Sequence, residues 1–226
     1  MSDILEHFSD PETLARYTEG PPRFVPGFHD MQRMAGLLIA ERVPDDARIL
    51  VLGAGGGLEL RTFAEAYPGW RFDGVDPAPD MLQLARRTLG PLAARAQLHE
   101  GYIDIAPEGP FDAATCLLTL HFLDREERLR TLAEIRRRLA PGAPFVAAHS
   151  SFPQTHERDL WLSRYAAFAI DSGADPEKVE TFRAAVEAHL NLLAPEEDEA
   201  LLREAGFADV SLFYAGFTWR GWVAYA

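Results

Sequence analysis

The sequence is poor in two residue types that often define function, cysteine and lysine. Its single cysteine, Cys116, excludes a disulfide framework and any zinc site built from cysteines. Lysine occurs once, at Lys178, so 21 of the 22 basic residues are arginines. The 35 acidic residues give a formal net charge of −13, and no dense basic patch interleaved with aromatic residues is present. A directly bound nucleic acid is therefore not expected.

Long apolar runs are also missing. No run approaches the roughly 20 residues needed to cross a bilayer, and residues 1–6 carry acids where a signal peptide carries bases. We therefore expect a cytoplasmic protein that does not associate with a membrane. The 226 residues, 47% of them hydrophobic and 25% charged, fit one α/β unit with an insertion, as a monomer or homodimer.

Short apolar runs alternate with stretches of helical periodicity from residue 48 onward. The predicted strands are residues 48–52, 70–76, 96–101, 111–118 and 143–150, with predicted helices at 58–67, 79–89 and 125–139. This alternation predicts parallel β-α-β units with helices on both faces of the sheet. A closing hairpin is predicted at 209–214 and 219–225. We therefore expect a Rossmann-like, doubly wound α/β fold with a mostly parallel seven-stranded sheet and a C-terminal antiparallel hairpin.

Two segments depart from this alternation. Residues 1–46 predict an N-terminal helical segment that covers the cleft, and residues 154–194 predict a helical insertion into the main domain, which spans 47–226. In the insertion Trp161, Tyr165 and Phe168 recur at helical spacing, which indicates either an aromatic lid over an acceptor or packing onto the main domain. Tyr17 and Arg23 either close the cleft from the other side or belong to a surface helix.

A glycine-rich turn joins the first strand to its helix. The spacing Gly53-x-Gly55-x-Gly57 lets the backbone approach a ligand closely, because glycine has no Cβ and tolerates left-handed dihedrals. A dinucleotide fingerprint requires glycine or alanine at the sixth position, which here is Leu58. Asp76 ends the second strand, close to the roughly 20 residues at which an acid accepts ribose hydroxyls. Asp73, in the middle of the same strand, is predicted to face solvent.

In several motifs the chain resembles the class I S-adenosylmethionine-dependent methyltransferases. The matching segments are residues 49–57 (ILVLGAGGG), 72–82, 111–118 and 139–143, and the resemblance extends over about residues 45–226. It implies S-adenosylmethionine as the cofactor, with the glycines lining its methionine and ribose and Asp76 holding both ribose hydroxyls. Met81 would pack near the adenine and Ile103 beside the adenine edge. The full predicted cofactor set is Gly53, Ala54, Gly55, Gly57, Asp76, Pro77, Met81, Tyr102, Ile103 and Leu117.

Two positions differ from the usual family pattern. Val51 stands where the first motif usually has an acid, and Tyr102 replaces the usual aspartate after Gly101. The acid at position 51 would support the loop and the amino end of the ligand. Glu59, at the start of the next helix, is a candidate to compensate for its loss.

Other segments are similar to the bacterial carboxy-S-adenosylmethionine synthases. They are residues 119–124, the insertion with 150–152, 213–224 and 25–28. An additional cofactor carboxylate needs a basic partner when buried, and those enzymes carry a basic residue just before a glycine of the insertion. Residues 169–173 contain Asp171 and no base, so we expect ordinary S-adenosylmethionine.

Methyl transfer from a sulfonium needs positioning and exclusion of water more than a fixed catalytic set. If the acceptor is a hydroxyl or an amine, His121 and His149 are candidate general bases, although a histidine in either place is more often structural. The predicted substrate set is Tyr17, Arg23, His121, Trp161 and Tyr165. The seven histidines have no cysteine partners and, apart from Asp3 and His7, form no i, i+4 pair with a carboxylate, so no metal is expected.

Three functions are compatible with these patterns. The first is a methyltransferase that acts on a small-molecule acceptor. The second is a non-catalytic protein that binds S-adenosylmethionine or S-adenosylhomocysteine, which Val51, Tyr102 and the lack of a clear base favour. The third is a dehydrogenase, which only the generic β-α-β pattern favours and which Leu58 opposes.

Overall fold

The computed structural model describes residues 10–189 and 191–226. Residues 1–9 of the predicted N-terminal segment and Leu190 of the predicted insertion lie outside the described residues.

A seven-stranded sheet forms the centre of the molecule, in the order β3-β2-β1-β4-β5-β7-β6. The strands are β1 (Arg48–Leu52), β2 (Arg71–Asp76), β3 (Ala96–Glu100), β4 (Ala113–Leu117), β5 (Pro144–Ser150), β6 (Ala208–Gly216) and β7 (Trp219–Tyr225). Strands β1 to β5 pair in parallel, whereas β7 pairs antiparallel with both β5 and β6. The predicted fold, including the C-terminal hairpin, is confirmed.

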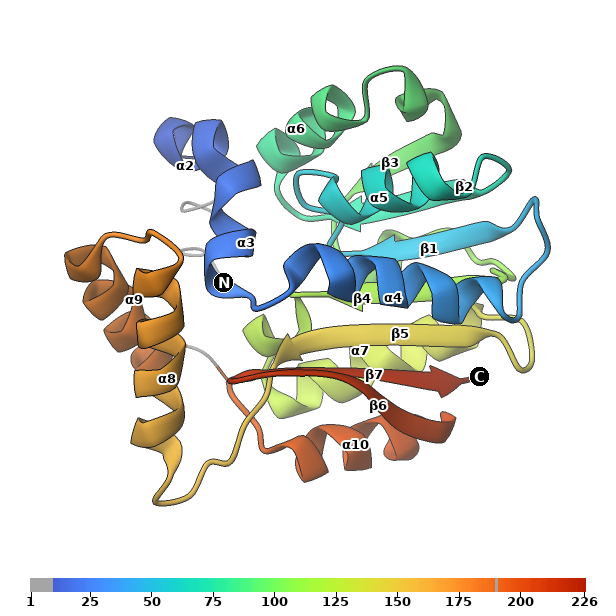
Figure 1. Ribbon diagram of the computed structural model, residues 1–226. Coiled ribbons are helices and arrows are strands. Elements are labelled where there is room, and N and C mark those ends of the chain that lie inside the picture. The colour runs from blue at the N-terminus through green and yellow to red at the C-terminus, as the bar shows by residue number, and fades with distance from the viewer. Residues whose placement is uncertain (1–9, 190) are drawn as a thin grey trace.

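Helices cover both faces of the sheet because its central strands are apolar on both sides. Ile49 and Val51 belong to the core beneath α4 (Phe28–Ala40), α5 (Leu58–Ala66) and α6 (Pro79–Leu89). Leu50 and Leu52 belong to a second core, packed against α7 (Arg125–Arg138) and α10 (Pro195–Glu204). Successive side chains of a strand point to opposite faces, and this alternation produces the layers seen in Figure 1.

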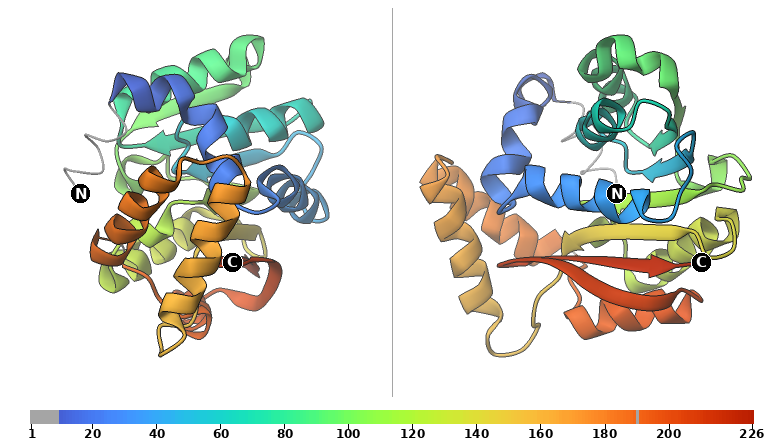
Figure 2. Two further views of the ribbon diagram at one scale, coloured as in Figure 1. Left: turned by 60° about the vertical axis from the view of Figure 1, so that its left-hand side comes forward. Right: turned by 45° about the vertical axis from the view of Figure 1, so that its right-hand side comes forward.

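The remaining helices gather beyond the carboxyl ends of the parallel strands (Figures 1 and 2). They are α2 (Pro11–Arg16), α3 (Gly20–Phe24), α8 (Arg158–Asp171) and α9 (Pro176–His189), with the short 3₁₀ turn η1 (Tyr17–Glu19) between α2 and α3. Helix α3 contacts α8, and α2 contacts α6. The N-terminal segment and the insertion therefore meet at the end of the sheet where a ligand crevice is expected. Over the described part of the chain, none of the helices combines the length and apolarity of a membrane span.

The prediction that Asp73 faces solvent is wrong. Its side chain is buried, and its carboxylate accepts hydrogen bonds from Arg48 Nε at 2.8 Å and pairs with His99 Nε2 at 2.8 Å. Both partners lie on the neighbouring strands β1 and β3. A buried acid at this position is stable because the adjacent strands supply its polar partners.

Candidate functional site

The loop after β1 bends sharply at its glycines. Gly53 has φ +76° and Gly55 φ +47°, which are left-handed values that favour glycine. A Cβ on Gly53 would lie 1.9 Å from Thr119 Oγ1, so the loop approaches the end of β4 closely. A Cβ on Gly57 would meet the Ala85 Cα of α6 at 2.9 Å. Gly57 therefore allows α5 and α6 to pack, whereas Gly53 and Gly55 shape the loop itself.

Asp76 holds this loop in place from the end of β2. Its carboxylate accepts a hydrogen bond from Gly55 N–H at 2.8 Å and another from Ala78 N–H at 2.9 Å. Burial raises the pKa of Asp76, and these two N–H donors partly oppose that rise. Each carboxylate oxygen has further acceptor capacity, so the group can also bind hydroxyls of a ligand.

A cavity opens at the carboxyl ends of β1, β2 and β4, next to this loop. It is lined by Tyr17, Pro21, Phe28, Gln32, Leu52, Gly53, Ala54, Gly55, Leu58, Glu59, Asp76, Pro77, Ala78, Met81, Gly101, Tyr102, Ile103, Leu117, Leu118, Thr119, Phe122, Leu123 and Thr131. Nine of the ten predicted cofactor residues are among them, and the exception is Gly57. Among these lining residues the charged types are two acids, Glu59 and Asp76, and none is lysine, arginine or histidine.

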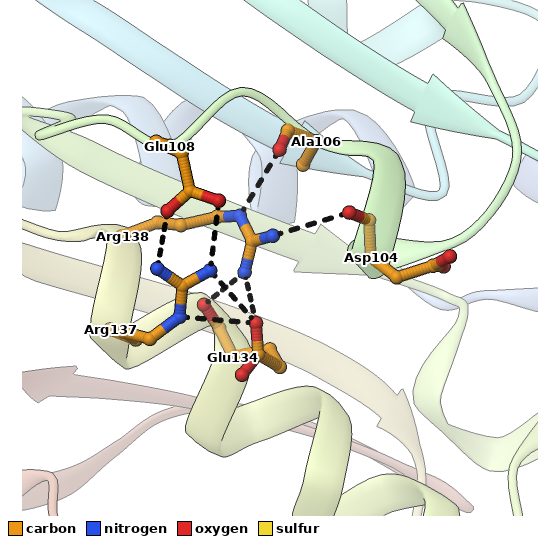
Figure 3. A network of polar contacts seen from close by, with 6 residues as sticks. All are labelled: Asp104, Ala106, Glu108, Glu134, Arg137 and Arg138. Atoms are coloured by element: carbon orange, nitrogen blue, oxygen red, sulfur yellow. Dashed lines mark hydrogen bonds and ion pairs between the residues drawn. The ribbon is translucent and has the colours of Figure 1, made fainter.

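The end of α7 contacts the segment of Asp104 and Ala106, directly after Ile103 (Figure 3). The buried guanidinium of Arg138 donates to the carbonyl of Ala106 at 3.3 Å and to that of Asp104 at 3.5 Å. Glu134, one turn earlier on α7, accepts from Arg138 and from Arg137. This network anchors the short 3₁₀ turn η3 (Ile103–Ile105) and so positions the cavity wall that Ile103 forms.

Glu59 and Tyr17 meet at the other side of the glycine loop. Glu59, on the first turn of α5, accepts a hydrogen bond from Thr115 Oγ1 at 2.5 Å, and burial raises its pKa to about 8. Tyr17 lies against Gly55 and Gly56, and its hydroxyl oxygen accepts a hydrogen bond from the Gly56 backbone N–H. Burial, together with the nearby Asp76 and Glu59, raises the pKa of Tyr17 to about 12, so the hydroxyl stays protonated. Of the predicted substrate residues, only Tyr17 lines the cavity.

Sequence reasoning missed the contribution of α4 to the cavity. Phe28 and Gln32 lie on its buried face, and Gln32 Oε1 accepts a hydrogen bond from Thr62 Oγ1 at 2.9 Å. The signal in the sequence was a polar residue, Gln32, at a core position of an otherwise apolar helical stripe, since buried polar groups need a function or a partner.

The two candidate bases lie outside the cavity, in a separate buried cluster. Ser150 N–H donates to His121 Nδ1 at 3.4 Å, and burial lowers the pKa of His121 well below its usual value. His149 Nε2 lies 3.2 Å from Asp198 Oδ2, and Arg128 donates to Asp198 Oδ1 at 2.5 Å. These contacts favour a structural role for both histidines, and neither histidine lines the cavity.

The predicted lid residues pack elsewhere. Tyr165 is buried and stacks on Phe24 with ring centroids 6.0 Å apart, and Phe168 packs on Phe217 at 6.1 Å. The guanidinium groups of Arg164 and Arg220 lie over the Trp161 ring, 4.7 and 5.5 Å from its centroid. Arg23 pairs with Glu19 at 3.1 Å. Phe168 of α8 therefore packs onto the main domain, as one of the two alternatives predicted, whereas Tyr165 packs onto the N-terminal segment, and Trp161, Tyr165 and Arg23 do not line the cavity.

The comparisons with known proteins agree in pointing to methyltransferase-like proteins. Residues 49–142 match the sequence family described as a methyltransferase domain. The chain is 28% identical over 232 residues to the carboxy-S-adenosyl-L-methionine synthase of Chromohalobacter salexigens, covering 99% of this chain and 85% of that protein.

Within the described residues no group of three or more histidine, cysteine, aspartate or glutamate side chains is placed to hold a metal ion.

Solved structures share the fold. A putative O-methyltransferase from Nostoc punctiforme superposes with a TM-score of 0.66 at 20% identity, over 89% of this chain and 57% of that one. PigF with SAH superposes with a TM-score of 0.67 at 19% identity, over 99% of this chain and 61% of that one. The chain thus spans roughly three fifths of these longer structures, and at this level of identity they establish the fold alone.

Proposed function

We propose that this chain, which resembles the class I S-adenosylmethionine-dependent methyltransferases and matches a methyltransferase domain over residues 49–142, transfers the methyl group of S-adenosylmethionine to a small, largely apolar acceptor. One observation carries the proposal. The glycine loop, Asp76 and the Ile103 turn line one cavity at the carboxyl ends of adjacent parallel strands.

The residues of this cavity fit the cofactor. Apolar side chains of Met81, Ile103 and Leu117 suit an adenine ring, and the Asp76 carboxylate has acceptor capacity for ribose hydroxyls. S-adenosylmethionine carries a positive sulfonium, and the charged side chains among the lining residues are both acids. The sulfonium therefore finds attraction in this cavity and no positive charge among those residues.

The sulfonium supplies an activated methyl group, so what remains for the chain is to bind, orient and exclude water. In the displacement an electron pair of the acceptor forms the new bond to the methyl carbon while the carbon–sulfur bond breaks. The apolar side chains of Phe28, Leu118 and Phe122 form the part of the lining that suits an apolar acceptor. Because both histidines lie elsewhere, we propose an acceptor atom that reacts without a protein histidine as its base.

A second candidate is synthesis of carboxy-S-adenosylmethionine, which the match to the Chromohalobacter salexigens protein favours. Its product carries an additional carboxylate, and a buried anion requires a cationic partner. The lining residues offer no lysine or arginine, and Asp171 closes α8 where the synthases carry a base. These observations favour the methyltransferase.

Calorimetric titration with S-adenosylmethionine, S-adenosylhomocysteine and NADH tests the proposed cofactor. We expect the first two to bind and NADH not to bind. Mass spectrometry of ligands that co-purify with the protein separates the two candidates, because the synthase would retain a cofactor that is heavier by one carboxyl group. Retention of that heavier cofactor would overturn the proposed methyl transfer.

A further inference from the structure

Glu59 is a buried acid in a position suited to bind a ligand. Its side chain belongs to α5, lines the cavity and is 5% exposed. Its described hydrogen bond is to the hydroxyl of Thr115, a neutral group. A carboxyl group in such surroundings is costly to ionise unless a positive charge approaches it.

The fold places Glu59 at one defined end of the cavity. Ile103 follows β3, Asp76 ends β2, the glycine loop follows β1, and Thr115 lies on β4 next to Val51. A cofactor with its adenine at Ile103 and its ribose at Asp76 therefore extends its amino acid portion toward the β1 and β4 ends. Glu59 reaches Thr115 at that end, because both lie on the face of the sheet that α5 covers.

We infer that Glu59 binds the positively charged amino acid portion of S-adenosylmethionine and gives the site its preference for a cationic cofactor. This inference rests on the proposed function. The cofactor carries two positive groups, an ammonium and a sulfonium, beyond its ribose. A charge-assisted hydrogen bond or ion pair between one of these groups and Glu59 forms only when the carboxyl is ionised.

The neighbours of Glu59 support this assignment. The titratable groups that interact with it are Tyr17 of the N-terminal segment and Cys116 of β4, and burial raises the pKa of both. Asp76, which interacts with Tyr17, adds a second acid across the loop. None of these groups is a cation, so none can stabilise ionised Glu59 in place of a ligand.

Glu59→Gln tests the inference, because glutamine matches the size of a protonated carboxyl and can keep a hydrogen bond to Thr115. Calorimetry at about pH 7 compares two ligands, S-adenosylmethionine and 5′-methylthioadenosine, which lacks the ammonium and the sulfonium. We expect E59Q to weaken S-adenosylmethionine binding about 10- to 100-fold and to leave methylthioadenosine binding unchanged. Glu59→Asp, which keeps the charge, should recover part of the lost affinity.

Glu65→Gln is the matched control, because Glu65 lies on the same helix with a half-exposed side chain paired to Arg61. We expect E65Q to bind both ligands as the native protein does. Equal S-adenosylmethionine affinity of E59Q and native protein would overturn the inference, and so would an equal loss for both ligands, since Glu59 would then only shape the loop. A native protein that binds neither ligand would instead overturn the proposed function itself.

Discussion

Asp198 and Glu59 are both almost fully buried, yet their surroundings shift their ionisation in opposite directions. Asp198 is 2% exposed; burial would raise its pKa, but His149 and Arg128 outweigh that effect and hold the pKa at about 2. Glu59 is 5% exposed, and burial raises its pKa to about 8 although Thr115 donates a hydrogen bond. The two side chains differ in whether the chain itself supplies a cation.

This difference separates a structural acid from one suited to a ligand. The pair of Asp198 and Arg128 joins α10 to α7, and Arg128 also donates to the carbonyl of Asn191 at 2.7 Å. A buried charge with such partners is part of the fold. Glu59 lines a cavity instead, and a strongly shifted acid in a cavity is typical of a functional site.

Removing the cation of the structural pair should have the largest effect. We expect Arg128→Met to lower the free energy of unfolding by about 3 to 5 kcal/mol, because Asp198 would remain buried beside one histidine. Urea denaturation at neutral pH measures this change. Arg130→Met, at an exposed position of the same helix, should cost less than about 0.5 kcal/mol. A similar small cost for R128M would mean that the pair contributes little to the fold.

Glu59 should make the stability of the unliganded protein fall as pH rises. Its pKa is about 8 in the folded state against 4.5 for a solvent-exposed glutamate, so between these values the folded state binds more protons than the unfolded state. Stability is therefore lost from about pH 5 to about pH 8, by an amount on the order of 2 to 4 kcal/mol. Denaturation curves at several pH values should show this loss in the native protein and not in E59Q. A parallel decline in both proteins would remove Glu59 as its cause.

A substitution of Asp76 should have an effect of intermediate size, because backbone N–H groups rather than cations face its carboxylate. Asp76→Asn should weaken S-adenosylmethionine binding by about 1.5 to 3 kcal/mol, the range for losing hydrogen bonds to a charged group. Calorimetry measures the affinity, and an unfolding curve checks that the variant is still folded. Unchanged affinity in a folded variant would show that Asp76 only holds Gly55 and Ala78.

The parts of the site that could be predicted from the sequence depend on local patterns. The glycine spacing, Asp76 at a strand end and the alternation of β1 act over short distances along the chain. Together with the family resemblance, they predicted ten cofactor positions, of which nine line the cavity. Gly57 followed the same motif but faces Ala85, because glycine also serves close packing of helices.

The parts that could not be predicted depend on partners far away in the sequence. Whether Asp73 is buried depends on Arg48 and His99 of the adjacent strands. Tyr165 stacks on Phe24, so the position of α8 depends on the N-terminal segment. A helical spacing shows that one face is apolar, but it does not identify the surface that this face covers.

The smallest effect is expected at Asp73, a buried acid whose cation remains in contact with water. The Arg48 side chain is 41% exposed and the Asp73 side chain 5% exposed. His99 would still pair with Asp73 after Arg48→Met, and methionine can keep contact with the Phe111 ring, which lies 4.3 Å from the Arg48 guanidinium carbon. We therefore expect a cost of about 1 kcal/mol, since water screens an exposed partner.

This cost should shrink in about 1 M sodium chloride, where the screening length falls to about 3 Å. Urea denaturation of the native protein and R48M at low and high salt measures the change, with Arg61→Met at the exposed pair with Glu65 as the control. A cost as large as that of R128M, and independent of salt, would mean that the exposure of the cation does not set the strength of a buried pair. If the cost is small and salt-dependent, the three acids form a graded series. Asp198 would then pair with a buried cation, Arg128, and Asp73 with a solvent-exposed cation, Arg48. Glu59 has no cation from the described chain, so its carboxylate is available to pair with the ligand.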